Sequence, residues 1–143
     1  MTGLPASSGT FTYGYTPAAG VSGAASRLIA SIGVPVTTAT ASIANLYDGL
    51  GRLTNTALNG SGGALLNRHG YLYKPANQIT QQTRTDGGYV SYTYDDAGEL
   101  ATGSTFTTGG TAVPAENFGY AYDASQNMIR RTNNATTAVY PVN

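Results

Sequence analysis

The 143-residue sequence is short of charge. Seven basic and seven acidic side chains make up 10% of the residues and give a formal net charge of zero, against about 25% charged residues in an average soluble protein. Because so few basic side chains cannot form a surface that attracts nucleic acid or an anionic membrane, we expect no nucleic-acid partner. The low charge also leaves strand edges without the side chains that normally prevent copies from pairing.

Cysteine, tryptophan and long apolar runs are also missing. The lack of cysteine excludes disulfides and thiolate metal sites. No run of about 18 apolar residues is present, so a membrane span is not expected. The first ten residues, MTGLPASSGT, have neither the charged nor the apolar region of a signal peptide. The compartment therefore stays open on these grounds.

Glycine (19 residues) and tyrosine (11 residues) are abundant, together with Thr, Ser and Ala. This composition favours strands and turns over helices. A chain of this length is sufficient for one domain with a hydrophobic core of its own. The composition therefore predicts a single all-β domain over residues 1–143.

The tyrosines recur in a pattern of five copies. The anchor position of each copy is a tyrosine, and four copies carry a second tyrosine two residues earlier, where the other copy has Asn45. The anchors are Tyr15, Tyr47, Tyr73, Tyr94 and Tyr122, and the earlier tyrosines are Tyr13, Tyr71, Tyr92 and Tyr120. Repeats this short cannot bury a hydrophobic face alone, so neighbouring copies must pack together.

Each anchor is followed by residues typical of a chain reversal. Asp comes directly after three anchors, at Asp48, Asp95 and Asp123. The fourth position after the anchor holds Gly51 or Gly98, with Ala19, Asn77 and Gln126 in the other copies. The sixth position is always apolar, at Val21, Leu53, Ile79, Leu100 and Met128.

These positions have a physical interpretation. Residues two apart on a strand share a face, so the paired tyrosines point the same way. Asp accepts hydrogen bonds from backbone N–H groups in the turn, and Gly or Asn tolerates a positive φ. The apolar residue then begins the return strand. Each copy is therefore expected to be an antiparallel β-hairpin with a loop of four to five residues, and successive hairpins to form a curved or spiralling sheet.

The segment 16–44 departs from this pattern. SGAASRLIASI (22–32) is compatible with a short helix capped by Ser22, but a strand is preferred. The β-branched residues that follow predict a strand over 36–47, whose start Pro35 would place at a sheet edge.

The motifs YDGLGRLT (47–54), YTYDDAGEL (92–100) and YAYDASQNMI (120–129) resemble the YD repeats of the Rhs family. That family includes bacterial Rhs polymorphic-toxin proteins, shell components of insecticidal toxin complexes, and teneurins. The resemblance covers roughly residues 11–132. It implies a non-catalytic structural segment, without cofactors, of a hollow shell that in longer relatives encloses a toxic polypeptide. It also implies a secreted or cell-surface location, and it makes this chain a piece of a larger protein or a shortened relative.

Few residues suggest other chemistry. His69, the only histidine, is expected to be a surface residue flanking a turn, because no catalytic partner is recognisable beside it. Paired carboxylates for hydrolysis, and a Ca²⁺ site at Asp95, Asp96 and Glu99, are weaker interpretations than turn capping, since no D-x-D-x-D-G loop is present. We therefore expect no enzyme, no metal and no cofactor.

Two questions about partners stay open. The tyrosine rings either pack between strands or form a platform for a carbohydrate or peptide. The uncapped ends of a short sheet predict self-association through open strand edges, unless the rest of a longer shell covers them.

Overall fold

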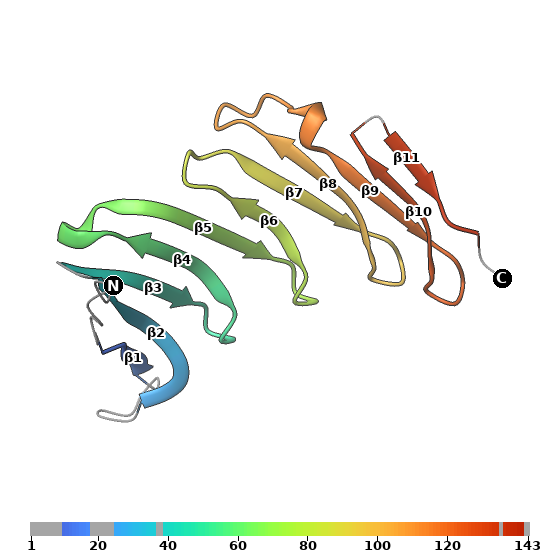
Figure 1. Cartoon of the computed structure of the whole chain (residues 1–143). Coiled ribbons are helices and arrows are strands. Elements are labelled where there is room, and N and C mark those ends of the chain that lie inside the picture. The colour runs from blue at the N-terminus through green and yellow to red at the C-terminus, as the bar shows by residue number, and fades with distance from the viewer. Residues whose placement is uncertain (1–9, 18–24, 37–38, 135, 142–143) are drawn as a thin grey trace, which may run out of the picture. The chain divides into compact units, whose positions relative to one another are not determined.

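The computed structural model describes residues 10–17, 25–36, 39–134 and 136–141 (Figure 1). The described chain is all-β, with two short 3₁₀ turns, η1 and η2. The strands are β1 (Thr12–Pro17), β2 (Ala25–Val36), β3 (Ala39–Tyr47), β4 (Leu53–Asn59), β5 (Leu65–Tyr73), β6 (Ile79–Thr83), β7 (Tyr89–Tyr94), β8 (Leu100–Phe106), β9 (Phe118–Tyr122), β10 (Met128–Asn133) and β11 (Thr136–Val139), and the turns are η1 (Ser61–Gly63) and η2 (Pro114–Glu116).

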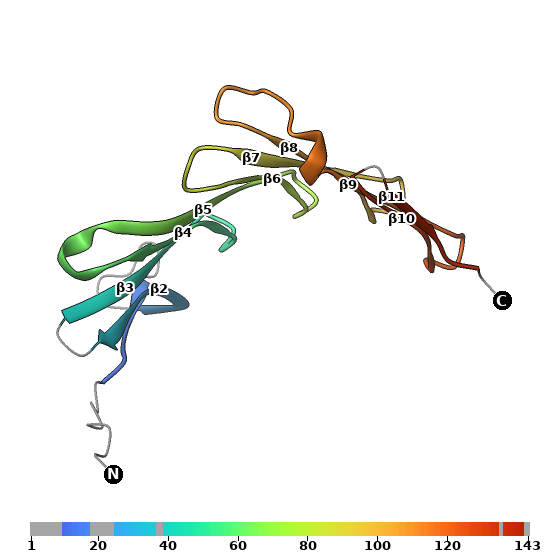
Figure 2. The same ribbon diagram turned by 45° about the horizontal axis from the view of Figure 1, so that its top comes forward.

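The strands follow one another in chain order through a single hydrogen-bonded sheet, from β1 to β11. Every described pairing is antiparallel. The prediction of consecutive antiparallel hairpins is therefore confirmed. The chain divides into two compact units, residues 1–69 and 70–143, which are described separately below. Figure 2 shows the second unit, β6 to β11, as one layer of strands.

Four hairpins have the same register at their turns. The anchor tyrosine ends one strand and pairs with the apolar residue six positions later, which begins the next strand. The pairs are Tyr47 with Leu53, Tyr73 with Ile79, Tyr94 with Leu100, and Tyr122 with Met128. Each pair lies beside a register shift, as expected where a β-bulge closes a hairpin loop.

The hairpin of Tyr15 has a longer connection. Tyr15 pairs with Ile29 in β2, again beside a register shift. Val21, the residue that the sequence pattern assigned to this place, lies outside the described residues. Ile29 therefore takes the position that Leu53, Ile79, Leu100 and Met128 hold in the other hairpins.

Two predicted boundaries need correction. Val36 ends β2 rather than beginning the next strand, which starts at Ala39, so the predicted strand over 36–47 was wrong at its start. Pro35 lies near the end of β2 and pairs with Thr40. It stands beyond Gly33, the last residue of β2 to pair with β1, so proline's missing N–H removes no bond to that strand. Residues 25–32 are strand, and the helical alternative for them was wrong.

The expected hydrophobic core is not found in the described part of the chain. Val90, at 5% exposure, is the one buried hydrophobic side chain there, and Thr105, at 2%, is the buried polar one. A single layer of strands cannot cover its own faces, because a sheet buries a face only against another layer. The fold is therefore held together mainly by contacts between neighbouring strands.

Candidate functional site

The hairpin turns form one recurring structure. In each turn the first residue donates its N–H to the carbonyl four residues later, and the fourth residue donates back to the first. The first residues are Asp48, Lys74, Asp95 and Asp123 after the anchor tyrosines, and Gly60, Arg84 and Thr107 at the opposite end of the strands. The fourth residue has a positive φ in every case: Gly51 (77°), Gly63 (81°), Asn77 (62°), Gly87 (83°), Gly98 (87°), Gly110 (80°) and Gln126 (66°).

The aspartates cap these turns. Asp48 Oδ1 accepts the N–H groups of Leu50 and Arg52 at 2.9 and 3.0 Å. Asp123 Oδ1 accepts those of Ser125 and Asn127 at 2.8 and 2.9 Å. Asp95 Oδ1 accepts the N–H of Glu99 at 2.9 Å. All three carboxylates therefore act on their own turns.

These bonds favour the ionised carboxylates. The backbone and side-chain hydrogen bonds from Arg52 lower the pKa of Asp48, and those from Asn127 lower the pKa of Asp123. Arg52 Nε also lies 2.6 Å from Asp48 Oδ2 as an ion pair. In the opposite direction, burial raises the pKa of Glu99, and the neighbouring Asp95 adds to the shift.

Three anchor tyrosines tie their hairpins to the preceding one. The Tyr94 hydroxyl donates to the backbone carbonyl of Ile79 at 2.8 Å, and the Tyr122 hydroxyl to that of Leu100 at 3.2 Å. In the first unit the Tyr47 hydroxyl donates to the carbonyl of Ile29 at 2.9 Å. Each acceptor is the residue that pairs with the anchor tyrosine of the preceding hairpin: Tyr15 with Ile29, Tyr73 with Ile79, and Tyr94 with Leu100. The same bond therefore recurs at three junctions between hairpins.

The repeat tyrosines of the second unit that stand two residues before an anchor share one face of the sheet. Directly paired residues in antiparallel strands lie on the same face, and side chains alternate along a strand. The registers place Tyr71, Tyr92 and Tyr120 on one face, which we call the aromatic face, together with Val90 and Phe118. The opposite face carries mainly small polar residues, such as Thr93 and Thr102, whose hydroxyls are 2.6 Å apart.

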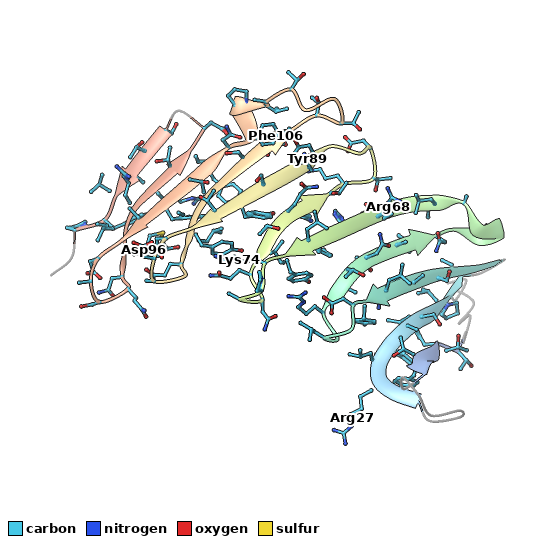
Figure 3. All side chains as sticks on the ribbon, turned by 180° about the vertical axis from the view of Figure 1, so that it is seen from behind. Arg27, Arg68, Lys74, Tyr89, Asp96 and Phe106 are labelled. Carbon is cyan, nitrogen blue, oxygen red and sulfur yellow. The ribbon has the colours of Figure 1, made fainter. Side chains whose placement is uncertain are left out.

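The opposite face has one aromatic pair at its end. Tyr89 and Phe106 are paired residues of β7 and β8, and their rings stack with centroids 5.0 Å apart (Figure 3). Figure 3 also shows Lys74 and Asp96 among the hairpin loops at the other end of these strands. The charged groups of the second unit thus gather largely at the loops.

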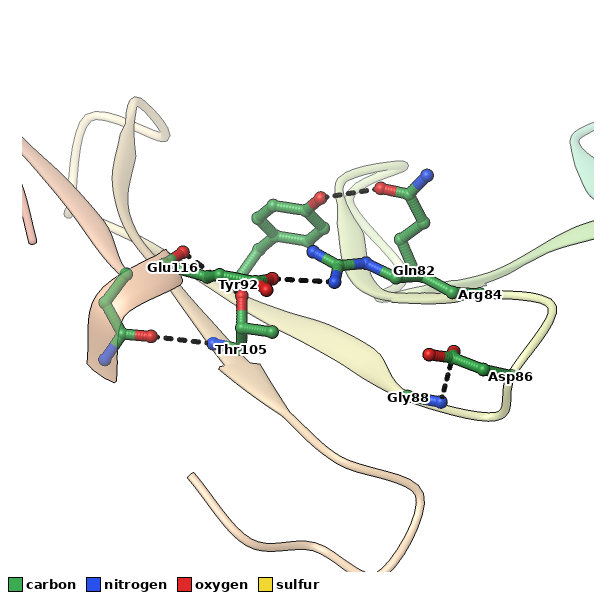
Figure 4. A network of polar contacts seen from close by, with 8 residues as sticks. Gln82, Arg84, Asp86, Gly88, Tyr92, Thr105 and Glu116 are labelled. Atoms are coloured by element: carbon green, nitrogen blue, oxygen red, sulfur yellow. Dashed lines mark hydrogen bonds and ion pairs between the residues drawn. The ribbon is translucent and has the colours of Figure 1, made fainter. Parts of the chain in front are cut away.

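A long connection between β8 and β9 contacts the buried residue Thr105. Thr105 donates its N–H to Asn117 Oδ1 at 2.8 Å and its hydroxyl to the carbonyl of Glu116 at 3.2 Å. Glu116 in turn forms an ion pair with Arg84 at 2.7 Å (Figure 4). This connection explains why Thr105 is among the least exposed residues of a single-layer sheet.

The aromatic face contains a pocket of about 220 Å³. It is lined by Tyr71, Ile79, Gln82, Tyr92, Tyr94 and Leu100. The Tyr92 hydroxyl donates to Gln82 Oε1 at 3.0 Å (Figure 4), and Lys74 Nζ lies 4.8 Å from the centre of the Tyr94 ring. Burial raises the pKa of the Tyr92 phenol, and the nearby Tyr94 adds to the shift.

Other sequence candidates lie apart from these contacts. His69 lies within β5 and does not flank a turn as predicted, and it borders a recess of about 160 Å³ with Ile43 and Leu58. Among the residues that the structure describes, no group of three or more His, Asp or Glu side chains could hold a metal ion. Tyr13 and Tyr15 are 55% and 50% exposed.

The sequence pattern located the turns and the tyrosines but not their bonds. Spacing alone cannot show that an anchor hydroxyl reaches a carbonyl one hairpin earlier. The ring of Phe118, whose centroid lies 6.3 Å from that of Tyr92 and 5.7 Å from that of Tyr120, was also missed, because Phe118 is not among the positions that the sequence pattern identified. A signal for it exists in Gly103, since an isolated glycine within a strand often marks a close approach.

Neither a family model nor a curated protein matches this chain. Solved structures similar to it include those of TcdB2-TccC3-Cdc42 (12% identity, TM-score 0.41, 74% of this chain) and TcdB2-TccC3-TEV (14%, 0.41, 73%). This chain spans 7% of the length of each. A porin-like protein from Bacteroides uniformis is similar at 16% identity and a TM-score of 0.31, over 78% of this chain and 59% of that one. Among the described residues, no helix is long and apolar enough to cross a membrane.

Proposed function

We propose that this chain is a non-catalytic structural segment, a stretch of YD-repeat wall of the Rhs type. The observation that carries the proposal is the tyrosine bond between hairpins, which joins Tyr47, Tyr94 and Tyr122 to the preceding return strand. A catalytic site needs one particular constellation of groups, whereas these residues repeat the same structural contact at three junctions.

The proposed wall is extended by further strands that pair with its exposed edge strand. β11 pairs with β10, and its four residues, TTAV, are all exposed and uncharged. An exposed strand without charge is a template for another strand. In the proposed function this edge receives a further hairpin, either from a longer shell that encloses a polypeptide or from a second copy of the chain.

Two measurements test the wall. Amide hydrogen exchange should show that Tyr122→Phe speeds exchange in β8 to β10 while β2 to β4 keep their rates, because each hairpin in a wall depends on its neighbours. If amide exchange were accelerated equally throughout the chain, the proposed wall would be contradicted. Sedimentation over a concentration series should detect self-association, and a strict monomer up to the solubility limit would remove the proposed edge pairing.

A binding module is the second candidate, favoured by the exposure of Tyr13 and Tyr15 in the first unit. Exposed aromatic rings can stack on sugars or contact a peptide. A glycan array combined with a tyrosine-fluorescence titration tests this function. Binding that is lost in Tyr13→Ala would support it, and a flat response to every ligand would end it.

A further inference from the structure

The strand β11 leaves one of its two edges without a neighbour in the described chain, where it is the last strand of the sheet (Figure 1). All four of its residues are exposed, Val139 at 73%, and Tyr140 just beyond it is 40% exposed. Its pairing with β10 runs without a register shift, and the strand contains neither a charged residue nor proline. Bulges, charges and prolines are the features that normally prevent an edge strand from pairing with another strand.

The backbone of β11 offers hydrogen-bonding groups at this edge. Tyr140 donates its N–H to the carbonyl of Ile129 in β10 at 2.8 Å. In an antiparallel pair, residues that bond the neighbouring strand alternate with residues whose N–H and C=O point away from it. By this alternation, the N–H and C=O groups of Thr137 and Val139 point away from β10 and toward the open edge.

A second copy of β11 satisfies all of these groups. An antiparallel pairing that places Ala138 opposite Ala138 of the other copy sets Thr137 opposite Val139 of the other copy, and the reverse. Each copy then donates two N–H groups and accepts at two carbonyls across a two-fold axis. A pairing shifted in one direction would set Thr137 opposite Pro141, which has no N–H. A pairing shifted in the other direction would leave Val139 beyond the end of the opposite β11.

The side chains of β11 suit the same register. Opposed residues in antiparallel strands share a face. Tyr140 would therefore lie opposite Thr136 of the other copy on the aromatic face, and Val139 opposite Thr137 on the other face. Aromatic and β-branched cross-strand pairs of this kind stabilise sheets. At the axis, where the Cα atoms approach to about 4.5 Å, the residue is the small Ala138.

Charge does not oppose this pairing. The formal net charge of the chain is zero. Arg131 in β10 pairs with Ala138, so the Arg131 residues of two copies would be separated by three strand spacings, or about 14 Å. This separation exceeds the Debye length of about 8 Å at physiological ionic strength, so their repulsion is screened.

We propose that β11 binds β11 of a second copy of this chain, as a symmetric antiparallel pair centred on Ala138. The inference rests on the proposed wall, because it names the strand that its open edge receives. A pair of such short strands buries less than the roughly 1,200 Å² of a stable interface, so the dimer forms reversibly and depends on concentration. The anchor hydroxyl bonds do not involve β11, so the wall stands if this pairing fails.

Disulfide cross-linking tests the register, since the chain has no cysteine of its own. Ala138→Cys places two thiols on the axis, where a Cα separation of about 4.5 Å permits a disulfide. Oxidation by diamide should then give a covalent dimer in non-reducing electrophoresis. Thr136→Cys is the matched control, on the same face of the same strand. Its two copies would lie about 13 Å apart along the strands and should cross-link about tenfold more slowly, or not at all. Equal rates, which a parallel pairing or random collision would give, overturn the proposal.

A proline variant tests the backbone bonds. In the Ala138→Cys protein, Thr137→Pro removes the N–H that points toward the second copy and none that bonds β10, so it should slow cross-linking about tenfold. Thr137→Val keeps the N–H and the branched side chain and should leave the rate unchanged. If the proline displaces β11 from the sheet, the comparison of the two cysteine variants still decides the matter. A protein in which Tyr122→Phe speeds exchange in β8 to β10, but in which both cysteines cross-link equally, keeps the wall and loses the symmetric pair.

Discussion

The hairpins β7–β8 and β9–β10 share one backbone design but not one set of residues. In both, the anchor pairs with the residue six positions later, and its hydroxyl binds the preceding hairpin. Yet the residue at positive φ is Gly98 in one and Gln126 in the other, and Leu100 is half-buried whereas Met128 is 38% exposed. The comparison shows that two features of the anchor tyrosine define the repeat: its pairing with the residue six positions later, and its hydroxyl bond to the preceding hairpin. The other positions vary with local burial.

The largest expected effect is the loss of stability when an anchor tyrosine is truncated, compared with truncation of a residue that an anchor pairs with. Tyr94→Ala removes a half-buried ring, its bond to Ile79 and its contact with Lys74, and should lower the free energy of unfolding by about 3 kcal/mol. Met128→Ala, at an exposed site, should lower it by less than half as much. Urea denaturation of both variants measures the difference, and equal losses would mean that the anchor has no special role.

Removing only the hydroxyl isolates the bond between hairpins. Tyr94→Phe and Tyr122→Phe should each lower the free energy of unfolding by about 1 kcal/mol, since each leaves a carbonyl without its donor. Tyr13→Phe, whose side chain is 55% exposed, is the matched control and should change little. Thermal denaturation followed by circular dichroism gives the three values. A loss as large in the control would assign the effect to something other than the bond.

Exchanging the residues at positive φ should equalise the two turns. Gln126→Gly relieves a side chain from the left-handed region and should stabilise the protein by up to about 1 kcal/mol. The reverse change, Gly98→Gln, should destabilise it by a similar amount. If both variants have the same melting temperature as the wild type, the turn tolerates either residue, and the positive φ at this position does not destabilise the protein.

The smallest expected effect is the response of the Asp123 turn to acid. Hydrogen bonds from Asn127 and Ser125 lower the pKa of Asp123 from its ordinary 3.8. A lowered pKa in the folded state means that the ionised carboxylate contributes stability above pH 3.8 and loses it as the pH falls further, through the folded-state value. Asp123→Asn should remove this part of the acid sensitivity in melting curves between pH 6 and pH 2 (roughly the range of carboxyl titration). An unchanged curve would contradict it.

The sequence was informative where a feature is local. Tyr47, Asp48, Gly51 and Leu53 lie within seven residues, and their order determines the turn without reference to the rest of the chain. The same rule misplaced the partner of Tyr15, because a longer connection brings in Ile29 from outside the pattern. Local propensity also could not place the boundary between β2 and β3, since β-branched residues continue across it.

Contacts between hairpins were beyond the reach of the sequence. The Thr105 bonds to Asn117 and Glu116 depend on how an irregular connection returns to the sheet. The expectation of a hydrophobic core failed for a related reason: chain length predicts a core only when elements pack in layers, and here strands are added side by side.

The hydroxyl bond between hairpins is open to direct observation. In protein labelled with ¹³C at the tyrosine Cζ and dissolved in equal parts of H₂O and D₂O, a slowly exchanging hydroxyl gives two resolved Cζ resonances. At low temperature and mildly acidic pH, Tyr47, Tyr94 and Tyr122 should each give such a pair, while the exposed Tyr13 and Tyr15 give one averaged line. A single averaged line for all five tyrosines would contradict the account.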